Sequence, residues 1–502
     1  MMVDGTRRAG RKAGLGGRLL LSFLVASTVG AAAALASPGA PAVLERASAT
    51  SDRPNVVVIE TDDQTSESMK VMQNVNSLIG AQGVTFANSF VNYSLCCPSR
   101  ATFLTGQYAH NHGVWTNTSP DGGFDRFEAL HAHNNLAVWL RHAGYYTALV
   151  GKYLNQYENR PSVPPGWSEW HAVAPDPYRP YDYTTNDDGK LTRHGDRPRD
   201  YEQDVLTRKA VDLVERRAPK AQPFFLWLTY SAPHSGGPYT DPNPPTNCDD
   251  APKPPPRYAH AFDSEPLPRP PDFDEPDVSD KPAAIRNRRR LNSSAIVYIE
   301  RNYRCELESL LSVDDGVKRL VDALQASGEL DNTLVIYTSD NGFFHGEHRI
   351  AQGKMRIYEE SIRVPLEMRG PGIPEGVSID PLAINADLAP TVVDAANANP
   401  GLTMDGRSLI PVAQNPGIEH GRQLLIEQPG LDAIRTHRYI YAEYKNGERE
   451  LYDLRRDPFE LHSRHKDPDY ASIEAELAAR LDRLKNCAGA GCRIHEPEPA
   501  GP

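Results

Sequence analysis

Short runs of apolar, β-branched residues alternate along this chain with segments of helical periodicity, and this alternation constrains the fold most strongly. Four runs read as strands buried on both faces, and helical segments at 135–144 and 311–324 precede two of them. Such an alternation favours a parallel sheet, because a helix usually connects parallel strands. We therefore expect an α/β fold with a large mixed, mostly parallel sheet between helices. The predicted strands are 55–59, 145–150, 223–230 and 333–337.

Each predicted strand ends in polar residues of the kind that form binding sites. Asp62-Asp63 ends the first strand, Lys152 the second, His234 the third and Asp340-Asn341 the fourth. Ligands bind beyond the carboxyl ends of parallel strands, so these side chains are expected to meet at one edge of the sheet. Each acidic pair alone is common turn chemistry. Together the oxygen ligands favour Ca²⁺ or Mg²⁺ over Zn²⁺, and the cationic groups favour an anion.

Two adjacent cysteines, Cys96 and Cys97, open the segment CCPSRATFLTG. After Pro98 the run from Ser99 to Leu104 can start a helix. A cysteine at that point would lie at a helix N-terminus, a position that favours anions. The local sequence also permits a buried thiol pair, a metal clip or a disulfide site.

The chain has six cysteines, and four of them have possible partners in an oxidising compartment. Cys487 with Cys492 would close a short loop, and Cys248 with Cys305 a longer one. The sequence alone does not settle the connectivity. If those four pair, the two adjacent cysteines remain, which fits a cysteine kept for chemistry. The second of the two has no proposed chemistry and is expected to be buried and structural.

The first 36 residues have the pattern of an export signal. A basic segment precedes an uncharged run from Leu19 to Ala36, which ends in an A-x-A cleavage pattern. An uncleaved membrane anchor is the alternative, because a run of this length can just span a bilayer. We expect a secreted or extracytoplasmic protein with no stable membrane span after cleavage. The formal net charge of −12 argues against nucleic acid as a partner.

The C-terminal part has a different pattern. Strand patterns at 439–444 and 448–454 flank Asn446-Gly447, which predicts a hairpin with a type I′ turn. A helical segment follows with its apolar residues on one face. We expect a small antiparallel sheet with one helix. Further upstream, Asp387 is expected to cap a helix from Leu388 to Ala396.

The segment from Cys96 to Gly106 resembles the signature of the type I sulfatases, C-x-P-S-R followed by Leu-Thr-Gly. The resemblance extends from about Asn55 to about Leu461 and indicates the sulfatase branch of the alkaline phosphatase superfamily. It implies that superfamily's fold and a sulfuric ester hydrolase. The other matching motifs are Glu60 to Asp63, Gly151 to Asn155, Ala232 to His234, Thr338 to Gly342, Lys354 with Tyr358 to Pro365, and Leu451 to Leu454 with Asp457-Pro458.

The resemblance also implies a modification and a set of roles. In that family the first cysteine is oxidised to formylglycine, so it implies formylglycine at Cys96 and a formylglycine-generating enzyme as partner. Arg100 would hold the hydrated aldehyde. One hydroxyl of the hydrate would attack sulfur and expel the alcohol, and the second would then drive the return to the aldehyde, which releases sulfate. The metal would be Ca²⁺, with Mg²⁺ or Mn²⁺ as alternatives. The residues that would bind this metal are Asp62, Asp63, Asp340, Asn341 and modified Cys96. The residues that would bind the sulfate and assist the leaving group are Lys152, His234 and Lys354.

One departure bears on the substrate. Many sulfatases have Lys-x-His where this chain has Lys152-Tyr153-Leu154, and Asn155 is the nearest polar substitute. The motifs are most similar to those of N-acetylglucosamine-6-sulfatases and heparan 6-O-endosulfatases, which implies a 6-O-sulfated amino sugar, with an aryl sulfate as the other candidate. We expect Asn155, His112 and His345 to contact the substrate.

Two alternatives share the same features: a phosphonate monoester hydrolase or phosphodiesterase of the same superfamily, and a carbohydrate-binding relative with a dead site. Residues 238–282 are rich in proline and interrupted by acids, so they are expected to form a long surface excursion tied by Cys248, or a passive disordered insert. The expected parts are a signal peptide at 1–36, a linker at 37–53, a catalytic domain at 54–412 that contains the insert, a small α+β subdomain at 413–486 and a tail at 487–502.

Overall fold

The computed structural model describes residues 53–157, 162–234, 248, 252–418 and 421–502. The predicted signal peptide and nearly all of the predicted linker lie outside the described residues. No described helix is both long enough and apolar enough to cross a membrane.

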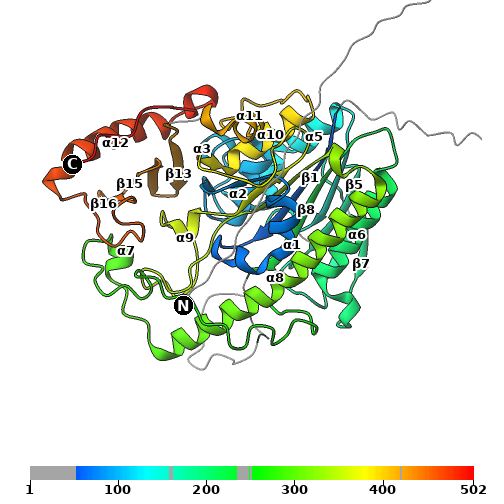
Figure 1. The fold of residues 1–502 in the computed structure, drawn as a ribbon, viewed down its shortest axis with the longest axis horizontal. Helices are drawn as coiled ribbons and strands as arrows, with labels where there is room; N and C mark the ends of the chain where they lie inside the picture. The colour runs from blue at the N-terminus through cyan, green and yellow to red at the C-terminus, as the bar shows by residue number, and fades with distance from the viewer. Residues whose placement is uncertain (1–52, 158–161, 235–247, 249–251, 419–420) are drawn as a thin grey trace, which may run out of the picture. The chain divides into compact units, whose positions relative to one another are not determined.

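The main sheet has ten strands in the order β11-β2-β10-β9-β1-β8-β4-β5-β6-β7 (Figure 1). Its five central strands, β9 to β5 in that order, run parallel. The outer strands join through antiparallel pairs on both sides, except that β11 pairs parallel with β2. This confirms the predicted α/β class with a mixed sheet. The strands are β1 Asn55–Asp62, β2 Val84–Phe86, β4 Tyr146–Gly151, β5 Glu169–Ala174, β6 Thr184–Asp187, β7 Lys190–Arg193, β8 Phe224–Pro233, β9 Thr333–Ser339, β10 Leu366–Arg369 and β11 Val377–Ile379.

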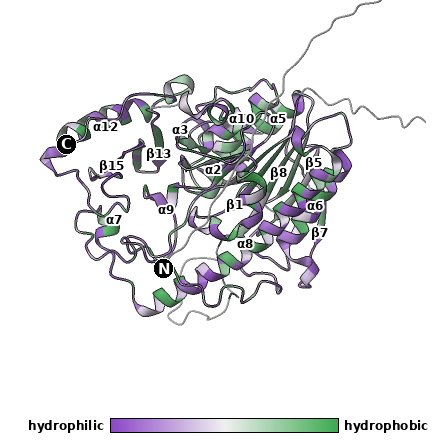
Figure 2. Ribbon diagram, viewed as in Figure 1, coloured by the Kyte–Doolittle hydropathy of each residue, from purple (hydrophilic) through white to green (hydrophobic). Residues whose placement is uncertain are grey.

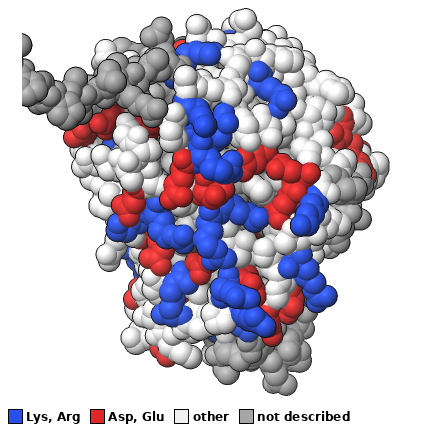
Figure 3. Space-filling model, turned by 90° about the vertical axis from the view of Figure 1, so that its right-hand side faces the viewer, with Lys and Arg blue, Asp and Glu red and all other residues white. Residues whose placement is uncertain are grey.

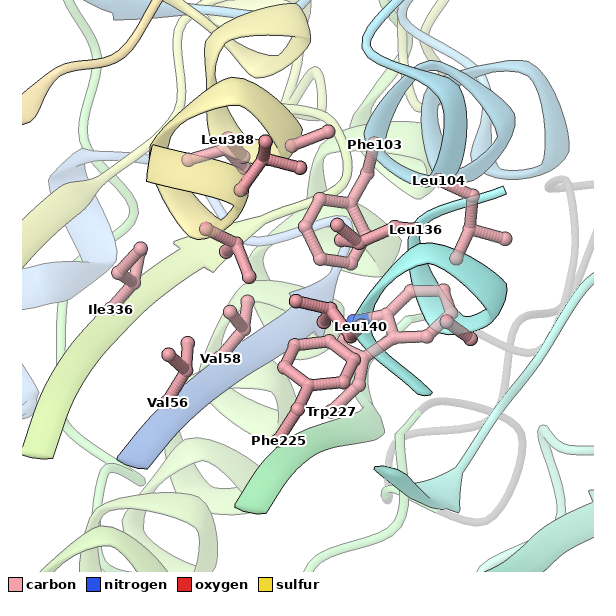
Figure 4. Close-up of a cluster of buried hydrophobic side chains, with 14 of the residues drawn as sticks. Val56, Val58, Phe103, Leu104, Leu136, Leu140, Phe225, Trp227, Ile336 and Leu388 are labelled. Carbon is pink, nitrogen blue, oxygen red and sulfur yellow. The ribbon is translucent and has the colours of Figure 1, made fainter. Parts of the chain in front are cut away.

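Helices cover both faces of this sheet because its central strands alternate apolar residues toward both (Figures 1 and 2). Val56 and Val58 of β1 pack with one group of helices, as Figure 4 shows, while Val57 and Ile59 pack with the other. The first group is α2 Cys96–Thr105, α4 Gly123–His131, α5 Leu136–His142, α10 Leu388–Ala395 and α11 Ile410–Gln414; the second is α1 Gln73–Val75, α6 Glu202–Arg217 and α8 Ser293–Ser327.

Helix α8 is much longer than the predicted segment 311–324. It begins at Ser293, where the Asn292 side chain accepts a hydrogen bond from Ala295 N at 2.8 Å, and it ends before Gly328, which has a φ of +76°. Its first half was missed because polar residues occupy its buried face. Asn302 and Glu306 are among them, at 0% and 5% exposure.

The C-terminal part forms a four-stranded antiparallel sheet with one helix, as predicted. The predicted type I′ turn is wrong. Gly447 has a positive φ and donates its N–H to Tyr444 O, but Asn446 does not have a positive φ, so the turn is a type I turn closed by a left-handed glycine. The elements are β13 Leu424–Gln428, β14 Leu431–Arg435, β15 Tyr439–Tyr444, β16 Arg449–Asp453 and α12 Ala471–Leu484.

Short elements complete the described fold. Strands β3 Ser89–Phe90 and β12 Ala383–Ile384 form a small parallel pair. The short helices are α3 Ala109–His112, α7 Ala283–Arg286 and α9 Glu359–Ile362, with single helical turns η1 Glu67–Val71, η2 Asn76–Gly80, η3 Pro198–Asp200, η4 Leu330–Asn332, η5 Asn385–Asp387, η6 Pro416–Ile418, η7 Pro468–Tyr470 and η8 Gly489–Cys492.

Both predicted disulfides form, Cys248–Cys305 and Cys487–Cys492, and Cys96 and Cys97 are free thiols. The described part of the proline-rich insert, residues 252–282, contains no helix or strand. The first disulfide joins this segment to α8.

The face that carries α6 and the sheet edge mixes both signs of charge (Figure 3). Arg216 pairs with Glu169 at 2.7 Å, and Lys209 pairs with Asp187 at 2.8 Å. Charges on this face therefore largely neutralise one another instead of forming a field of one sign.

Asp387 does not cap α10 with its side chain, contrary to expectation. Its carboxylate instead accepts two hydrogen bonds from Arg422, at 2.6 and 2.7 Å, and one from Ile384 N at 3.0 Å. Both side chains of this pair are buried, at 0% and 2% exposure. Nearby, Asn385 donates a hydrogen bond to Ser99 Oγ at 2.9 Å, so the pair stabilises the turn against which α2 packs.

Arg422→Met is expected to reduce the free energy of unfolding by about 3–5 kcal/mol, because it leaves the Asp387 charge buried without its partner. Burial raises the pKa of Asp387, but Arg422 outweighs it and holds that pKa below the ordinary value. The loss should therefore persist above about pH 4 and shrink as the pH falls further. Denaturant unfolding measures it. The matched control is Arg438→Met, whose guanidinium also binds a carboxylate with two hydrogen bonds but is 19% exposed. It should cost about 1 kcal/mol, and equal losses would contradict the assignment.

Candidate active site

The ends of four neighbouring parallel strands bring the predicted site residues together. Strands β9, β1, β8 and β4 are adjacent in the sheet, and polar residues stand at or just after their carboxyl ends. Asp62, Lys152 and Asp340 are at most 1% exposed, and the His234 side chain is 18% exposed. The register of the sheet thus forces charges into the protein interior at one edge.

The acidic groups form a compact set. Asn341 Nδ2 donates to Asp63 Oδ1 at 2.5 Å, and Asp63 N donates to Asp340 Oδ1 at 3.3 Å. Asp63 itself has a φ of +68°, a left-handed conformation that few residues other than glycine and asparagine adopt readily. That turn directs its carboxylate back toward Asp62 and the strand ends.

Cys96 is the first residue of α2 and is completely buried. Its Sγ lies 3.4 Å from Asp62 Oδ1 and 3.0 Å from Lys354 Nζ. Cys97, by contrast, belongs to the hydrophobic core that Figure 4 illustrates. The two thiols therefore have opposite environments, one polar and one apolar.

Arg100 connects the helix to the strand ends. It follows Cys96 by one helical turn and is 0% exposed. Its Nε donates to Asp340 Oδ2 at 2.8 Å, and its Nη1 donates to the backbone oxygen of Lys152 at 3.0 Å. The guanidinium also lies 3.8 Å from a carboxylate oxygen of Glu60. It is thus held by three strands at once.

The charged groups of the site shift one another's pKa values. Burial and then Asp62 raise the pKa of the Cys96 thiol to about 12, so the thiol is protonated at neutral pH. Burial also raises the pKa of Asp62, but Lys152, whose Nζ contacts the Asp62 carboxylate, outweighs it and keeps that pKa well below the ordinary value. Burial raises the pKa of Asp340 to about 7. The ionised forms of these buried carboxylates are therefore stabilised by the neighbouring cations.

Lys354 comes from the loop after β9 and completes the set. Its Nζ contacts the Asp63 carboxylate and lies 3.3 Å from Asn341 Oδ1. Burial lowers the pKa of Lys354, but Asp63 and Cys96 raise it well above the ordinary value, so the group stays cationic. Its side chain is 12% exposed.

Tyr178 is a site residue that the sequence did not reveal. It lies in the loop between β5 and β6, where no local pattern marks it. Its ring stacks on His234 with centroids 4.0 Å apart, and Lys152 Nζ lies 4.8 Å from its ring centre. Asn155 donates to the Tyr178 hydroxyl at 3.0 Å. Asn155 thus reaches the site through this tyrosine.

The two histidines predicted to contact substrate lie elsewhere. His112 is 1% exposed, and its ring nitrogens are hydrogen-bonded to Thr102 Oγ1 and Val114 N, each at 3.1 Å, so the ring offers no free nitrogen to a ligand. His345 pairs with Glu306 at 2.5 Å and lines a separate cavity of about 210 Å³. The structure does not bring either one to the Cys96 thiol.

The donor set fits a hard divalent cation. One ligand atom each of Asp62, Asp63, Cys96 and His234 lie within 4.8 Å of one another. The second carboxylate oxygen of Asp63 is buried without a hydrogen-bond partner, which is costly unless a cation satisfies it. Carboxylate and amide oxygens are the ligands that Ca²⁺ prefers.

Comparison with known proteins identifies the family of the chain. The sulfatase family model matches residues 54–398, and the model described as N-sulphoglucosamine sulphohydrolase, C-terminal, matches residues 346–487. The first match spans the strand ends, Cys96 and Lys354. It covers more than half of the chain.

Individual relatives agree. Human N-acetylglucosamine-6-sulfatase is 32% identical over 492 residues, covering 88% of this chain and 86% of the relative. An extracellular sulfatase homolog, Sulf-1, of Caenorhabditis elegans is 36% identical over 361 residues, covering 71% of this chain but only 48% of the relative's length. A structure solved with its substrate D-glucosamine-2-N,6-O-disulfate has a TM-score of 0.71 and 26% identity, covering 86% of this chain and 97% of its own. The chain belongs to the sulfatase family.

Proposed function

We propose that the protein is a secreted, metal-dependent sulfatase that hydrolyses a sulfate monoester, with a 6-O-sulfated N-acetylglucosamine or an aryl sulfate as substrate. The observation that carries this proposal is the environment of Cys96. A buried thiol at a helix start touches a carboxylate and an ammonium group at once. Relatives named as extracellular sulfatases and as N-acetylglucosamine-6-sulfatases support secretion and the sugar substrate.

Two groups would supply chemistry that the thiol lacks. The first is formylglycine at position 96, made by a formylglycine-generating enzyme. Its hydrate would supply one hydroxyl as the nucleophile and a second hydroxyl that allows sulfate to leave without attack of water on sulfur. A divalent ion, Ca²⁺ by the donor set, would supply a fixed positive charge beside that nucleophile. Asp62, Asp63, Asp340 and Asn341 would hold it.

Arg100 and Lys152 would orient and balance the site. Arg100 holds Asp340 and the backbone of Lys152, so it fixes the position of α2 relative to the strand ends. In the same position it can donate to an oxygen on residue 96. The Lys152 ammonium is 1% exposed and offers a permanent charge to a sulfate oxygen at the closed end of the site.

Lys354 and His234 would serve the leaving group. They are the more exposed of the polar groups around Cys96, at 12% and 18%, which marks the side from which an ester would enter. The face of His234 adjoins a shallow hollow lined in part by Tyr178, Gln203 and Lys253. An ester that enters from this side would bring its bridging oxygen near the Lys354 ammonium, which can give a proton to the departing alcohol, and near His234, which can donate a hydrogen bond to it.

Substrate contacts would come from the same side. Tyr178 presents a ring and a hydroxyl held by Asn155, an arrangement suited to the apolar face and the hydroxyls of a sugar. We propose that Asn155 binds the substrate through Tyr178, and that His345 binds it from the separate cavity that this histidine lines. His112 has no part in this proposal.

Cys96→Ala should abolish sulfate ester hydrolysis, with a loss of roughly 10⁴-fold or more in kcat, because the nucleophile derives from this side chain. Cys97→Ala is the matched control and should retain most activity. Steady-state assays and circular dichroism check both, and mass analysis of the peptide across Cys96 in protein from the native host tests the modification. Retained activity in Cys96→Ala would refute the nucleophile, and an unmodified thiol in active protein would refute formylglycine.

The enzyme should hydrolyse an aryl sulfate faster than an aryl phosphodiester with the same leaving group. The comparison of kcat/KM for the two esters separates a sulfatase from a phosphonate monoester hydrolase or phosphodiesterase. Faster phosphodiester turnover would overturn the proposal, and no turnover of either ester or of 6-sulfated N-acetylglucosamine would favour a non-catalytic relative.

Tyr178→Leu should lower kcat/KM about tenfold, because the His234 ring loses the stacked partner that orients it. Tyr178→Phe keeps the stacking and loses only the hydroxyl, so with an aryl sulfate it should remain near wild type. The same two variants assayed on 6-sulfated N-acetylglucosamine test the hydroxyl in sugar binding through KM. Equal activity of both variants on the aryl ester would contradict a positioning role for the ring.

A further inference from the structure

A second buried cluster of potential ligands lies outside the site described above. It consists of Asp272 from the proline-rich insert, His348 from the loop after β9, and Glu360 from α9; we refer to these three residues as the Asp272 cluster. One ligand atom from each lies within 4.8 Å of the others. Both Asp272 and His348 are 0% exposed.

Apart from a contact between the Asp272 and Glu360 carboxyl groups, four polar atoms of this cluster have no hydrogen-bond partner among the described residues. Both carboxylate oxygens of Asp272, Nε2 of His348 and Oε2 of Glu360 are buried in this state. Buried polar atoms are satisfied in the great majority of cases, and an unsatisfied one costs about 1–3 kcal/mol. Because ligand atoms of these three residues lie within 4.8 Å of one another, the unsatisfied atoms indicate a missing common partner.

The missing partner is a cation, because the surroundings carry excess negative charge. Glu275, Glu347 and Glu460 lie around the cluster at 2%, 7% and 1% exposure. Lys281 pairs with Glu275 at 3.3 Å and donates to backbone oxygens. Arg349 likewise donates to backbone oxygens. Burial, more than any neighbouring charge, raises the pKa of Asp272 to about 6.

The histidine is already in the form that a metal ligand takes. Its Nδ1 lies 2.8 Å from Glu275 Oε2 and can donate to that carboxylate, which leaves Nε2 with a free lone pair facing the two acids. Burial lowers the pKa of His348 to about 3, so the ring is neutral at neutral pH. A carboxylate that fixes the far nitrogen is the usual outer partner of a metal-bound histidine.

We propose that Asp272, His348 Nε2 and Glu360 bind a divalent transition-metal ion, Zn²⁺ or Mn²⁺. One imidazole nitrogen with two carboxylates suits these ions, whereas Ca²⁺ takes oxygen ligands only. The site is distinct from the oxygen-rich set around Asp63. It also does not depend on the proposed hydrolytic function.

The ion would fasten the insert to the loop that carries Lys354. His348 N already donates to Asp272 O at 2.8 Å. Glu360 sits next to Ser361, whose backbone oxygen accepts from Gly342 N at 3.0 Å, directly after Asn341. At Gly342 a Cβ would lie 2.1 Å from Glu360 O, so the two backbones are in close contact. The role we assign to this ion is therefore structural.

The test measures metal on the full chain without using activity. Chelator-washed protein, saturated with Ca²⁺ to fill the first site, is titrated with Mn²⁺ and followed by electron paramagnetic resonance, then with Zn²⁺ followed by elemental analysis. The wild type should bind one further ion per chain. Asp272→Asn and Glu360→Gln should each lose it or weaken it at least tenfold.

Asp274→Asn is the matched control. Asp274 stands two residues from Asp272 but has its own partners, Arg290 Nε at 2.7 Å and Leu291 N at 2.8 Å. This variant should keep the ion. Added Zn²⁺ should also raise the midpoint of thermal unfolding of the wild type by about 2–5 °C but leave Asp272→Asn unchanged.

Three outcomes would overturn the proposal. The wild type binds no ion beyond Ca²⁺; the ion binds equally in Asp272→Asn and Glu360→Gln, and thus elsewhere; or metal-free Asp272→Asn is as stable as the wild type and Zn²⁺ stabilises neither, which would mean that a shared proton fills the cluster. If Asp272→Asn does not fold, the wild-type titration and Glu360→Gln decide the question.

Discussion

The contacts of the Arg100 guanidinium are the interaction on which the site depends. This one buried side chain binds Asp340 after β9 and the backbone after β4, lies near Glu60 of β1, and has its charge centre 5.9 Å from the Trp227 ring of β8. A buried guanidinium is costly unless it is paired, and here Nε and Nη1 are hydrogen-bonded while Nη2 is buried without a hydrogen-bond partner among the described residues. Its partners on several strands therefore fix the position of α2, and with it Cys96 one turn earlier, the residue from which the proposed nucleophile derives.

Cys96 and Cys97, adjacent at the start of α2, have different environments for a geometric reason. Successive residues on a helix point about 100° apart. Cys96 therefore faces the charged strand ends, while Cys97 faces the apolar core. The chain can carry two neighbouring thiols because the fold separates their environments.

The sequence predicted what depends on strand register and failed where contacts are long-range. Asp62, Lys152, His234 and Asp340 were predictable as neighbours because parallel strands present their carboxyl ends on one edge. Residues that reach a site from elsewhere in the chain were not predictable in this way. Tyr178 reaches His234 from a loop with no periodic pattern, and the first half of α8 buries polar residues. The Asp272 cluster joins the insert to residues more than 70 positions further along the chain. Only the folded chain brings such groups together.

The complete burial of α2 sets an order of events during biosynthesis. All ten of its residues are inaccessible, and Cys96 is at 0% exposure. An enzyme that makes the proposed formylglycine would therefore have to reach this thiol before the helix docks on the sheet. Maturation and folding would then compete in time, and a chain that folds first would keep its thiol permanently. The fraction of competent protein would be decided by kinetics in the cell and not by the stability of the finished fold.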